Sequence, residues 1–149
     1  MEHSPNPDRL IFKLLYMVKR FTDKASTAAL STLISEDFNS TFIPYFMSIG
    51  YAGISNHDLV SKILVTKQGV SKTVKELERL GLVYTGKSET DARSIMIYLT
   101  DKGKNLFSAI CEMADDMTDD YIKLVGAKKY EQFIDTFVKI SKWHESQEQ

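Results

Sequence analysis

The fold is set by residues 55–103, which read SNHDLVSKILVTKQGVSKTVKELERLGLVYTGKSETDARSIMIYLTDKG. Ser55 and Asp58 have the spacing of a capping box, in which the serine side chain accepts hydrogen bonds from free amides at the start of a helix. Thr66 is a candidate N-cap for a second helix shortly afterwards. These signals predict two helices joined by a tight turn.

The second helix is expected from about Lys67 to Leu80, and it is amphipathic. Val70, Val74 and Leu77 recur at helical spacing and predict a buried face. The opposite face carries Gln68, Ser71, Lys72, Lys75 and Arg79. Such side chains can pair with base edges in the major groove of DNA or with phosphate. An ordinary solvated helix face explains them equally well, so the helix alone does not decide between the two readings.

A β-hairpin is predicted after this helix. Gly81 fits the left-handed position that ends a helix. Residues 87–92 are polar and turn-like, and residues 93–99 alternate as in a half-buried strand, with Ile95 and Ile97 on the apolar face. Two helices followed by a hairpin is the plan of a winged helix-turn-helix, a DNA-binding module.

The hairpin ends in a recognisable pattern of an Asp-x-Arg pair, a strand and a Leu-Thr-x-x-Gly run, made by Asp91, Arg93, Leu99, Thr100 and Gly103. This pattern resembles the wing of the MarR family of bacterial regulators, and the flanking helical segments are similar too, so the resemblance covers nearly the whole chain. It implies that Arg93 enters the minor groove, whose negative potential attracts arginine, and that Asp91 orients it. Thr85 departs from the pattern, because many members carry a cation there.

The predicted fold class is mostly α with a small β-hairpin wing (α+β), in a single domain over residues 1–149. The winged helix-turn-helix module is expected at residues 36–104, which we call the winged module, with dimerisation helices at 8–35 and 105–146. Apolar residues between 10 and 21 form a face too broad for one small neighbour. A homodimer would bury this face. A long intramolecular packing contact is the alternative.

Helix boundaries outside the module are less clearly marked. The first helix is expected to run up to a connection near residues 36–40. Another helix is expected over 42–51, with Thr41 as its cap. After the wing, Thr100 is expected to cap a long helix that reaches about Val125.

Charge is distributed unevenly along the chain. The net charge of −1 taken alone argues against nucleic-acid binding. Residues 61–110, however, hold 9 basic and 5 acidic side chains, whereas residues 111–149 hold 5 basic and 9 acidic ones. Basic residues concentrated on the second helix and the wing are the footprint expected of a DNA-binding surface.

The remaining features favour a cytoplasmic protein without catalytic chemistry. A single cysteine, Cys111, cannot form an internal disulfide, and the N-terminus lacks the apolar core of a signal peptide. We expect a buried, inert thiol, although a redox role is left open. No spacing suggests a nucleophile with its base or a phosphate-binding loop, so no enzyme activity and no cofactor are expected. A solvated face is expected instead of a metal site for four clustered carboxylates, Asp115, Asp116, Asp119 and Asp120.

The resulting candidate DNA-contacting residues are Thr66, Lys67, Gln68, Ser71, Lys72, Lys75, Lys87, Asp91 and Arg93. The expected partner is double-stranded DNA with a palindromic operator, bound by a homodimer. The resemblance further implies a repressor, and a small aromatic effector that enters a pocket between the pairing helices and the module. Candidates for that pocket are Tyr16, Phe42, Tyr45 and Phe46, although core packing explains the same aromatic residues. The alternative function is a winged-helix protein-interaction module without specific DNA binding.

Overall fold

The computed structural model describes residues 6–63 and 67–148, and this part of the chain is mostly helical with a small antiparallel sheet. The helices are α1 (Ile11–Leu30), α2 (Ile43–Ile49), α3 (Asn56–Ile63), α4 (Lys67–Arg79), α5 (Asp101–Val125) and α6 (Ala127–Gln147), with short 3-10 turns η1 (Pro7–Arg9) and η2 (Ser40–Phe42). The strands are β1 (Ile54–Ser55), β2 (Val83–Lys87) and β3 (Ile95–Leu99). The predicted fold class is confirmed.

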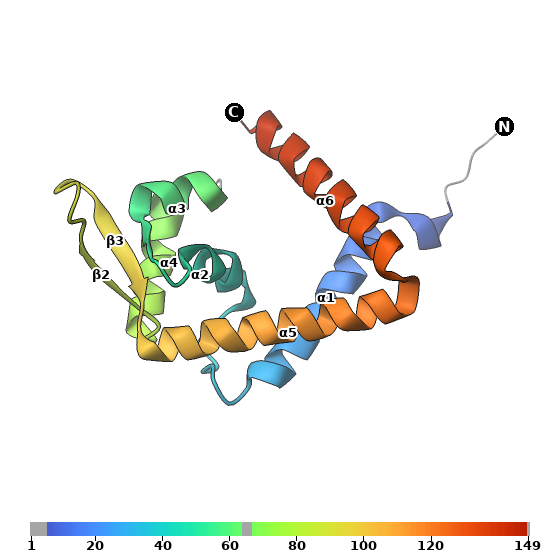
Figure 1. The fold of residues 1–149 in the computed structure, drawn as a ribbon, viewed down its shortest axis with the longest axis horizontal. Coiled ribbons are helices and arrows are strands. Elements are labelled where there is room, and N and C mark those ends of the chain that lie inside the picture. Colours follow the sequence, from blue (N-terminus) through green and yellow to red (C-terminus); the bar gives the residue numbers. More distant parts are fainter. Residues whose placement is uncertain (1–5, 64–66, 149) are drawn as a thin grey trace.

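The elements form two regions joined by α5. Figure 1 shows α2, α3, α4 and the hairpin gathered at one end, with α5 running away from them and crossing α1. At the far end of α5 the chain turns at Gly126, whose φ is +88°, and α6 leads back. We call α1 and α6 the terminal helices. No helix in the described part of the chain is long and apolar enough to cross a membrane.

The sheet has the strand order β1-β3-β2, with both pairings antiparallel. Val83 pairs with Leu99, and Lys87 pairs with Ile95 at the other end of the hairpin. Ile54 in β1 pairs with Ile97 from the opposite side. The sequence did not predict β1, because two residues are too few to show an alternating pattern.

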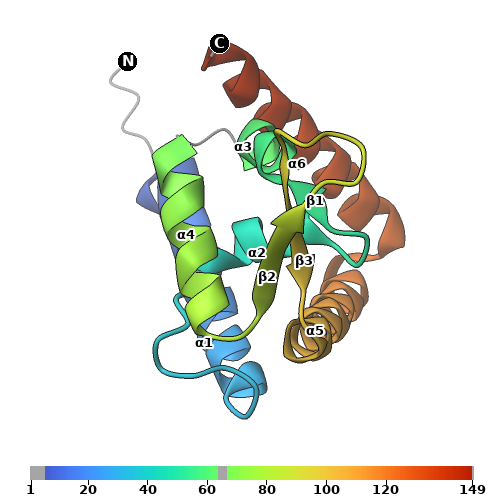
Figure 2. The same ribbon diagram turned by 90° about the vertical axis from the view of Figure 1, so that its left-hand side faces the viewer.

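The main apolar core lies inside the winged module. Phe46, Leu59, Leu77, Ile97 and Leu106 are each less than 2% exposed. These five come from α2, α3, α4, β3 and α5 in turn, and β2 adds the buried Val83 to the same core. Figure 2 shows α4 beside the hairpin, with α5 beneath the sheet. The first turns of α5 therefore belong to the core of the module.

The start of α5 is tied to the base of the wing. The Thr100 hydroxyl accepts a hydrogen bond from the Gly103 N–H (3.0 Å), as the predicted cap requires, and donates one to the Gly81 carbonyl oxygen (2.6 Å). Gly81 has a φ of +75°, which confirms its predicted place after α4. A Cβ at position 103 would lie 2.0 Å from the Leu82 carbonyl oxygen. The Leu-Thr-x-x-Gly pattern therefore joins α4, the wing and α5 at one point.

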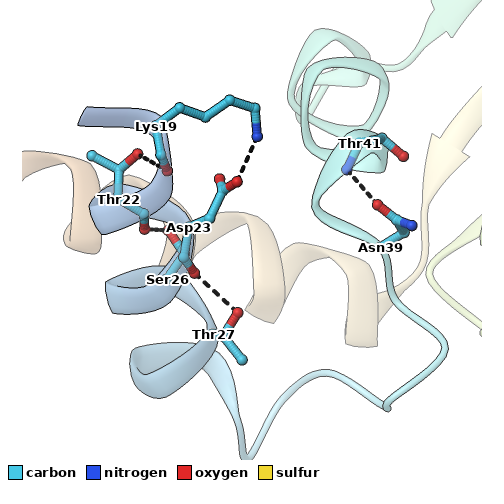
Figure 3. A network of polar contacts seen from close by, with 7 residues as sticks. All are labelled: Lys19, Thr22, Asp23, Ser26, Thr27, Asn39 and Thr41. Atoms are coloured by element: carbon cyan, nitrogen blue, oxygen red, sulfur yellow. Dashed lines mark hydrogen bonds and ion pairs between the residues drawn. The ribbon is translucent and has the colours of Figure 1, made fainter. Parts of the chain in front are cut away.

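The first helix ends at Leu30, earlier than predicted. Hydroxyl side chains near its end bond back to carbonyl oxygens of the preceding turn, including Ser26 to Thr22 (2.6 Å) and Thr27 to Asp23 (3.0 Å) (Figure 3). Back-bonding of this kind is tolerated in a helix but slightly weakens it. Leu30 is buried, and its carbonyl oxygen accepts hydrogen bonds from turn residues after the helix. The connection therefore begins near residue 31, not near residue 36.

The predicted cap at Thr41 is wrong. The side-chain oxygen of Asn39 accepts a hydrogen bond from the Thr41 N–H (2.9 Å), as Figure 3 shows, and so caps the turn η2. The helix α2 begins only at Ile43, with Pro44 in its first turn, and it ends at Ile49 instead of residue 51. An asparagine reaches an amide two residues ahead easily, and this local competition moved the start of the helix.

Apolar side chains on the terminal helices are mostly exposed. Only Leu30 is buried on α1, and no residue of α6 is buried. The exposed apolar residues of α1 are Ile11, Phe12, Leu14, Leu15, Tyr16, Val18 and Phe21. Those of α6 are Phe133, Phe137, Val138, Ile140 and Trp143. The broad apolar face predicted for the first helix is thus present and uncovered in the single chain.

Candidate nucleic-acid interface

One face of α4 is packed and the other is open. Val70, Val74 and Leu77 are buried against the module core, as the periodicity predicted. The open face carries Gln68, Ser71, Lys72 and Lys75, all exposed, and these residues line a shallow hollow of about 320 Å³ together with Glu76. The side chains predicted to read bases therefore lie together on the open face of α4.

Arg79, which the sequence placed on the same open face, is held by carboxylates. Its Nε donates to Glu76 Oε2 (3.1 Å) and its Nη2 donates to Asp37 Oδ2 (3.3 Å). The hydrogen bonds to Glu76 and then Asp37 raise the pKa of Arg79 above its usual value. Arg79 therefore ties the end of α4 to the connection after α1, and its charge is already matched by two acidic groups.

A groove of about 760 Å³ separates α4 from the wing. Its lining residues are Asn56, His57, Val60, Lys67, Val70, Ser71, Val74, Lys75, Glu78, Thr85, Asp91, Arg93, Ser94, Ile95 and Ile97. The groove thus brings Lys67, Ser71 and Lys75 from α4 together with Asp91 and Arg93 from the wing. Three basic side chains from two separate elements face one space, which is the arrangement a polyanion needs.

Three of the predicted residues that the structure describes do not line this groove: Gln68 and Lys72, which line the hollow on the open face of α4, and Lys87. Lys87 ends β2 and is exposed, opposite Ile95 across the hairpin, but it does not line the groove. Thr66 lies outside the described residues. Ile95 was predicted on the apolar face with Ile97, yet it is 48% exposed whereas Ile97 is 1% exposed. The hairpin extends beyond the core at that point, so only its base is packed.

The wing tip is a hydrogen-bonded loop organised by two side chains. The Ser88 hydroxyl accepts hydrogen bonds from the main-chain N–H groups of Thr90 and Asp91, each at 3.3 Å. The Asp91 carboxylate accepts one from the main-chain N–H of Arg93 (3.0 Å). Asp91 therefore fixes the main chain at Arg93.

Ten residues of the groove lining were not predicted as site residues, and five of them are polar: Asn56, His57, Glu78, Thr85 and Ser94. Asn56 and His57 come from the first turn of α3, and Glu78 and Thr85 face each other from α4 and β2. The Thr85 hydroxyl donates a hydrogen bond to Glu78 Oε1 (3.0 Å). Thr85, where the sequence departs from the family pattern, therefore has a hydrogen-bond partner in Glu78. The two residues are seven positions apart in the sequence, on either side of the end of α4 and a turn.

The four candidate effector-pocket residues occupy different environments. Tyr16 is 64% exposed on α1, and Phe42 and Tyr45 are half-buried. Phe46 is fully buried and packs edge-on against Phe38, with ring centroids 6.4 Å apart. None of the four lines either of the two hollows described above. In the single chain, Phe46 acts as a core residue and Tyr16 as a surface residue.

The sequence and the fold were compared with known protein families and solved structures. The model of the MarR family matches residues 44–94, which run from α2 to the wing. The transcriptional regulator SlyA is similar in structure, with a TM-score of 0.75 at 20% identity over 93% of this chain and 96% of that one. FabT of Streptococcus pneumoniae in complex with DNA gives 0.69 at 19% identity, over 88% and 94%.

A third similar structure is the PcaV transcriptional regulator of Streptomyces coelicolor in complex with its natural ligand, with a TM-score of 0.62 at 17% identity over 84% of this chain and 89% of that one. No curated protein matches the sequence significantly. At such identities the structural likeness establishes a shared fold.

Proposed function

We propose, from the premise that this chain belongs to the MarR family of winged helix-turn-helix regulators, that it binds a specific double-stranded DNA sequence as a homodimer. The observation that carries the proposal is the groove between α4 and the wing, where Lys67, Lys75 and Arg93 face one space. A helix fits the major groove of B-DNA, and a projecting hairpin beside it reaches the adjacent minor groove.

The candidate contacts divide by role. Gln68, Ser71, Lys72 and Lys75 on the open face of α4 are proposed to read base edges, because amide, hydroxyl and ammonium groups pair with major-groove donors and acceptors. Thr66, Lys67 and Lys87 are proposed to contact phosphates. Arg93 is proposed to enter the minor groove, with Asp91 holding the loop beneath it.

The homodimer is proposed to form through the terminal helices. The apolar residues of α1 and α6 are exposed in the single chain, and a two-fold partner would cover them. This proposal assigns dimerisation to residues 8–35 and 105–146, apart from the first turns of α5 that pack in the module core, and DNA binding to residues 36–104. Two modules related by a two-fold axis read two inverted half-sites, so the operator is expected to be palindromic.

Repression and release by an effector complete the proposal. A dimer bound at a promoter excludes other proteins from the DNA it covers. The similarity to a regulator whose structure was solved with its natural ligand supports an effector here as well. That this effector is small and aromatic is what the family resemblance implies. Its pocket is proposed between the terminal helices and the winged module, next to Tyr16, Phe42, Tyr45 and Phe46. As a regulator of chromosomal genes, the protein would act in the cytoplasm.

Selection of duplexes from a random pool, followed by titration at several salt concentrations, tests the proposal. We expect a palindromic sequence to emerge, and its affinity to fall with salt by a logarithmic slope of about −0.9 per neutralised phosphate. Gln68→Ala should change preference at particular base pairs, whereas Lys87→Ala should weaken all duplexes alike. If no sequence is enriched and binding does not depend on salt, the alternative of a protein-interaction module is favoured. The net charge of −1 is consistent with that alternative.

A further inference from the structure

Glu78 is one of two carboxylates, with Asp91, that line the groove proposed to bind DNA. It lines the groove together with Lys67, Lys75 and Arg93, and it is exposed. A negative charge facing a phosphate backbone lowers affinity by simple Coulomb repulsion. Its presence there calls for a compensating role, and the contacts of the side chain indicate which one.

The contact that Glu78 makes crosses the groove. Its Oε1 accepts a hydrogen bond from the Thr85 hydroxyl at 3.0 Å, and the two residues belong to opposite walls, α4 and β2. A bond to a carboxylate is stronger than one between neutral groups. Thr85 is the central residue of β2 and pairs in the sheet with Ile97, which is 1% exposed. The bond therefore connects α4 to the middle of β2 in the wing.

The position of the bond complements the other attachments of the wing. At the base, Thr100 and Gly103 fix the junction of α4, β2 and α5. At the tip, Asp91 fixes only the local loop around Arg93. Between these points the outer half of the hairpin leaves the core, as the 48% exposure of Ile95 shows. Thr85 lies where the packed half of the hairpin gives way to the free half.

We infer that Glu78 and Thr85 are a positioning pair that sets the angle between α4 and the wing. In this arrangement α4 and Arg93 engage adjacent grooves of DNA at the same time. This inference rests on the proposed function. Holding the two binding elements in their bound arrangement lowers the ordering cost of association. Neither residue need contact DNA.

The Glu78→Ala and Glu78→Gln variants test the pair, because simple repulsion predicts tighter DNA binding for both. The positioning role predicts weaker binding for Glu78→Ala, by about three- to tenfold per half-site for one lost hydrogen bond. Glu78→Gln keeps an acceptor for the Thr85 hydroxyl and should bind at least as tightly as the parent. Thr85→Val, which loses the bond but keeps the carboxylate, should bind no more tightly than Glu78→Ala, and Thr85→Ser, which keeps the hydroxyl, should bind like the parent.

The effect should also depend on the duplex. With the selected palindrome shortened so that the flanks reached by the wings are missing, Glu78→Ala and the parent should bind equally. The double variant Glu78→Ala/Thr85→Val should be no weaker than either single variant on the full duplex. The salt slope should not change, because no phosphate contact is lost. Glu89→Ala, which removes an exposed carboxylate from the wing tip, is the matched charge control and should bind slightly tighter.

Two results would overturn the inference. Tighter binding by Glu78→Ala, equal to that of Glu89→Ala, would mean that Glu78 acts only through its charge. A shifted base preference in Glu78→Ala that Thr85→Val does not share would make Glu78 a base-reading residue. If the parent protein selects no duplex at all, the proposed function itself has failed, and that result is separate from any ranking among the variants.

Discussion

The winged module and the terminal helices differ in how they use their apolar side chains. In the module, Phe46, Leu59 and Leu77 are buried completely within one chain. The terminal helices α1 and α6 are 20 and 21 residues long, yet together they bury only Leu30. The module therefore holds together through its own core, whereas the terminal helices present apolar surface that becomes stabilising only when a second surface covers it.

The largest effect is expected from charges placed on α6. Phe133 and Phe137 lie side by side with ring centroids 5.3 Å apart, and both are exposed in the single chain. About half of each ring is still exposed, so burial by a partner contributes roughly 0.8–1.5 kcal/mol per ring, half the value for a fully exposed phenylalanine. Phe133→Asp/Phe137→Asp should therefore convert the proposed dimer to a monomer in analytical ultracentrifugation at micromolar concentration. The control is Tyr84→Ser, which removes an exposed aromatic from the module and should leave association unchanged. An undisturbed dimer would place the interface elsewhere.

A smaller but still large effect is expected at the base of the wing. Gly103→Ala places a methyl group 2.0 Å from the Leu82 carbonyl oxygen, so the backbone must move. Overpacking of this kind typically costs about 1–3 kcal/mol, occasionally more. Urea denaturation should show the loss. Gly86→Ala is the matched control, because its nearest contact would be the Tyr98 ring at an ordinary 4.0 Å. Equal stabilities for both variants would show that α5 is not locked to the wing.

The third effect separates DNA binding from assembly. Arg93→Ala should weaken binding to the selected duplex by about 1–3 kcal/mol and make the salt slope shallower by about one unit. Association should stay unchanged, because Arg93 lies on the wing and far along the chain from the terminal helices. Asp91→Ala should weaken binding less, since it loosens the loop without removing the cation. Fluorescence anisotropy at several salt concentrations measures both quantities, and an unaltered slope would exclude a phosphate contact by Arg93.

The smallest effect is expected from Thr100→Val, which keeps the shape of the side chain but removes its hydroxyl. The lost cap and the lost bond to Gly81 together should cost about 1 kcal/mol of stability. Thr100→Ser should recover most of this loss. A variant as stable as the parent would mean that packing of Leu82 and Gly103 alone holds the junction.

The sequence predicted the elements whose signals are local and repeated. The span of α4 followed from the spacing of Val70, Val74 and Leu77, and its end followed from Gly81. The cap of α5 at Thr100 was also predicted correctly from the sequence. Each of these depends on residues within one turn or one period of each other, so the physical cause lies inside a short window of sequence.

What the sequence missed depends on contacts between distant segments or on competing local bonds. β1 is defined by its pairing with β3, more than forty residues later, and not by its own two residues. Arg79 was read as an open cation because Asp37 lies far away in the chain. The Asn39 cap and the end of α1 at Leu30 depended on side-chain bonds that compete with the helix. For the candidate site, the residues on α4 could be listed in advance, but the groove they share with the wing could not.

Because the junction at Thr100 and Gly103 fixes α5 to the winged module, a rotation of α5 would move the module with it. The helix has 25 residues, which at its normal rise makes it about 37 Å long. One end is fixed to the wing and to α4, and the other adjoins α6. A rotation of about 5° at the α6 end would displace the module by about 3 Å, close to one base-pair step of about 3.4 Å. In the proposed dimer, a small rotation would thus change the spacing of the two DNA-binding modules by about one base-pair step.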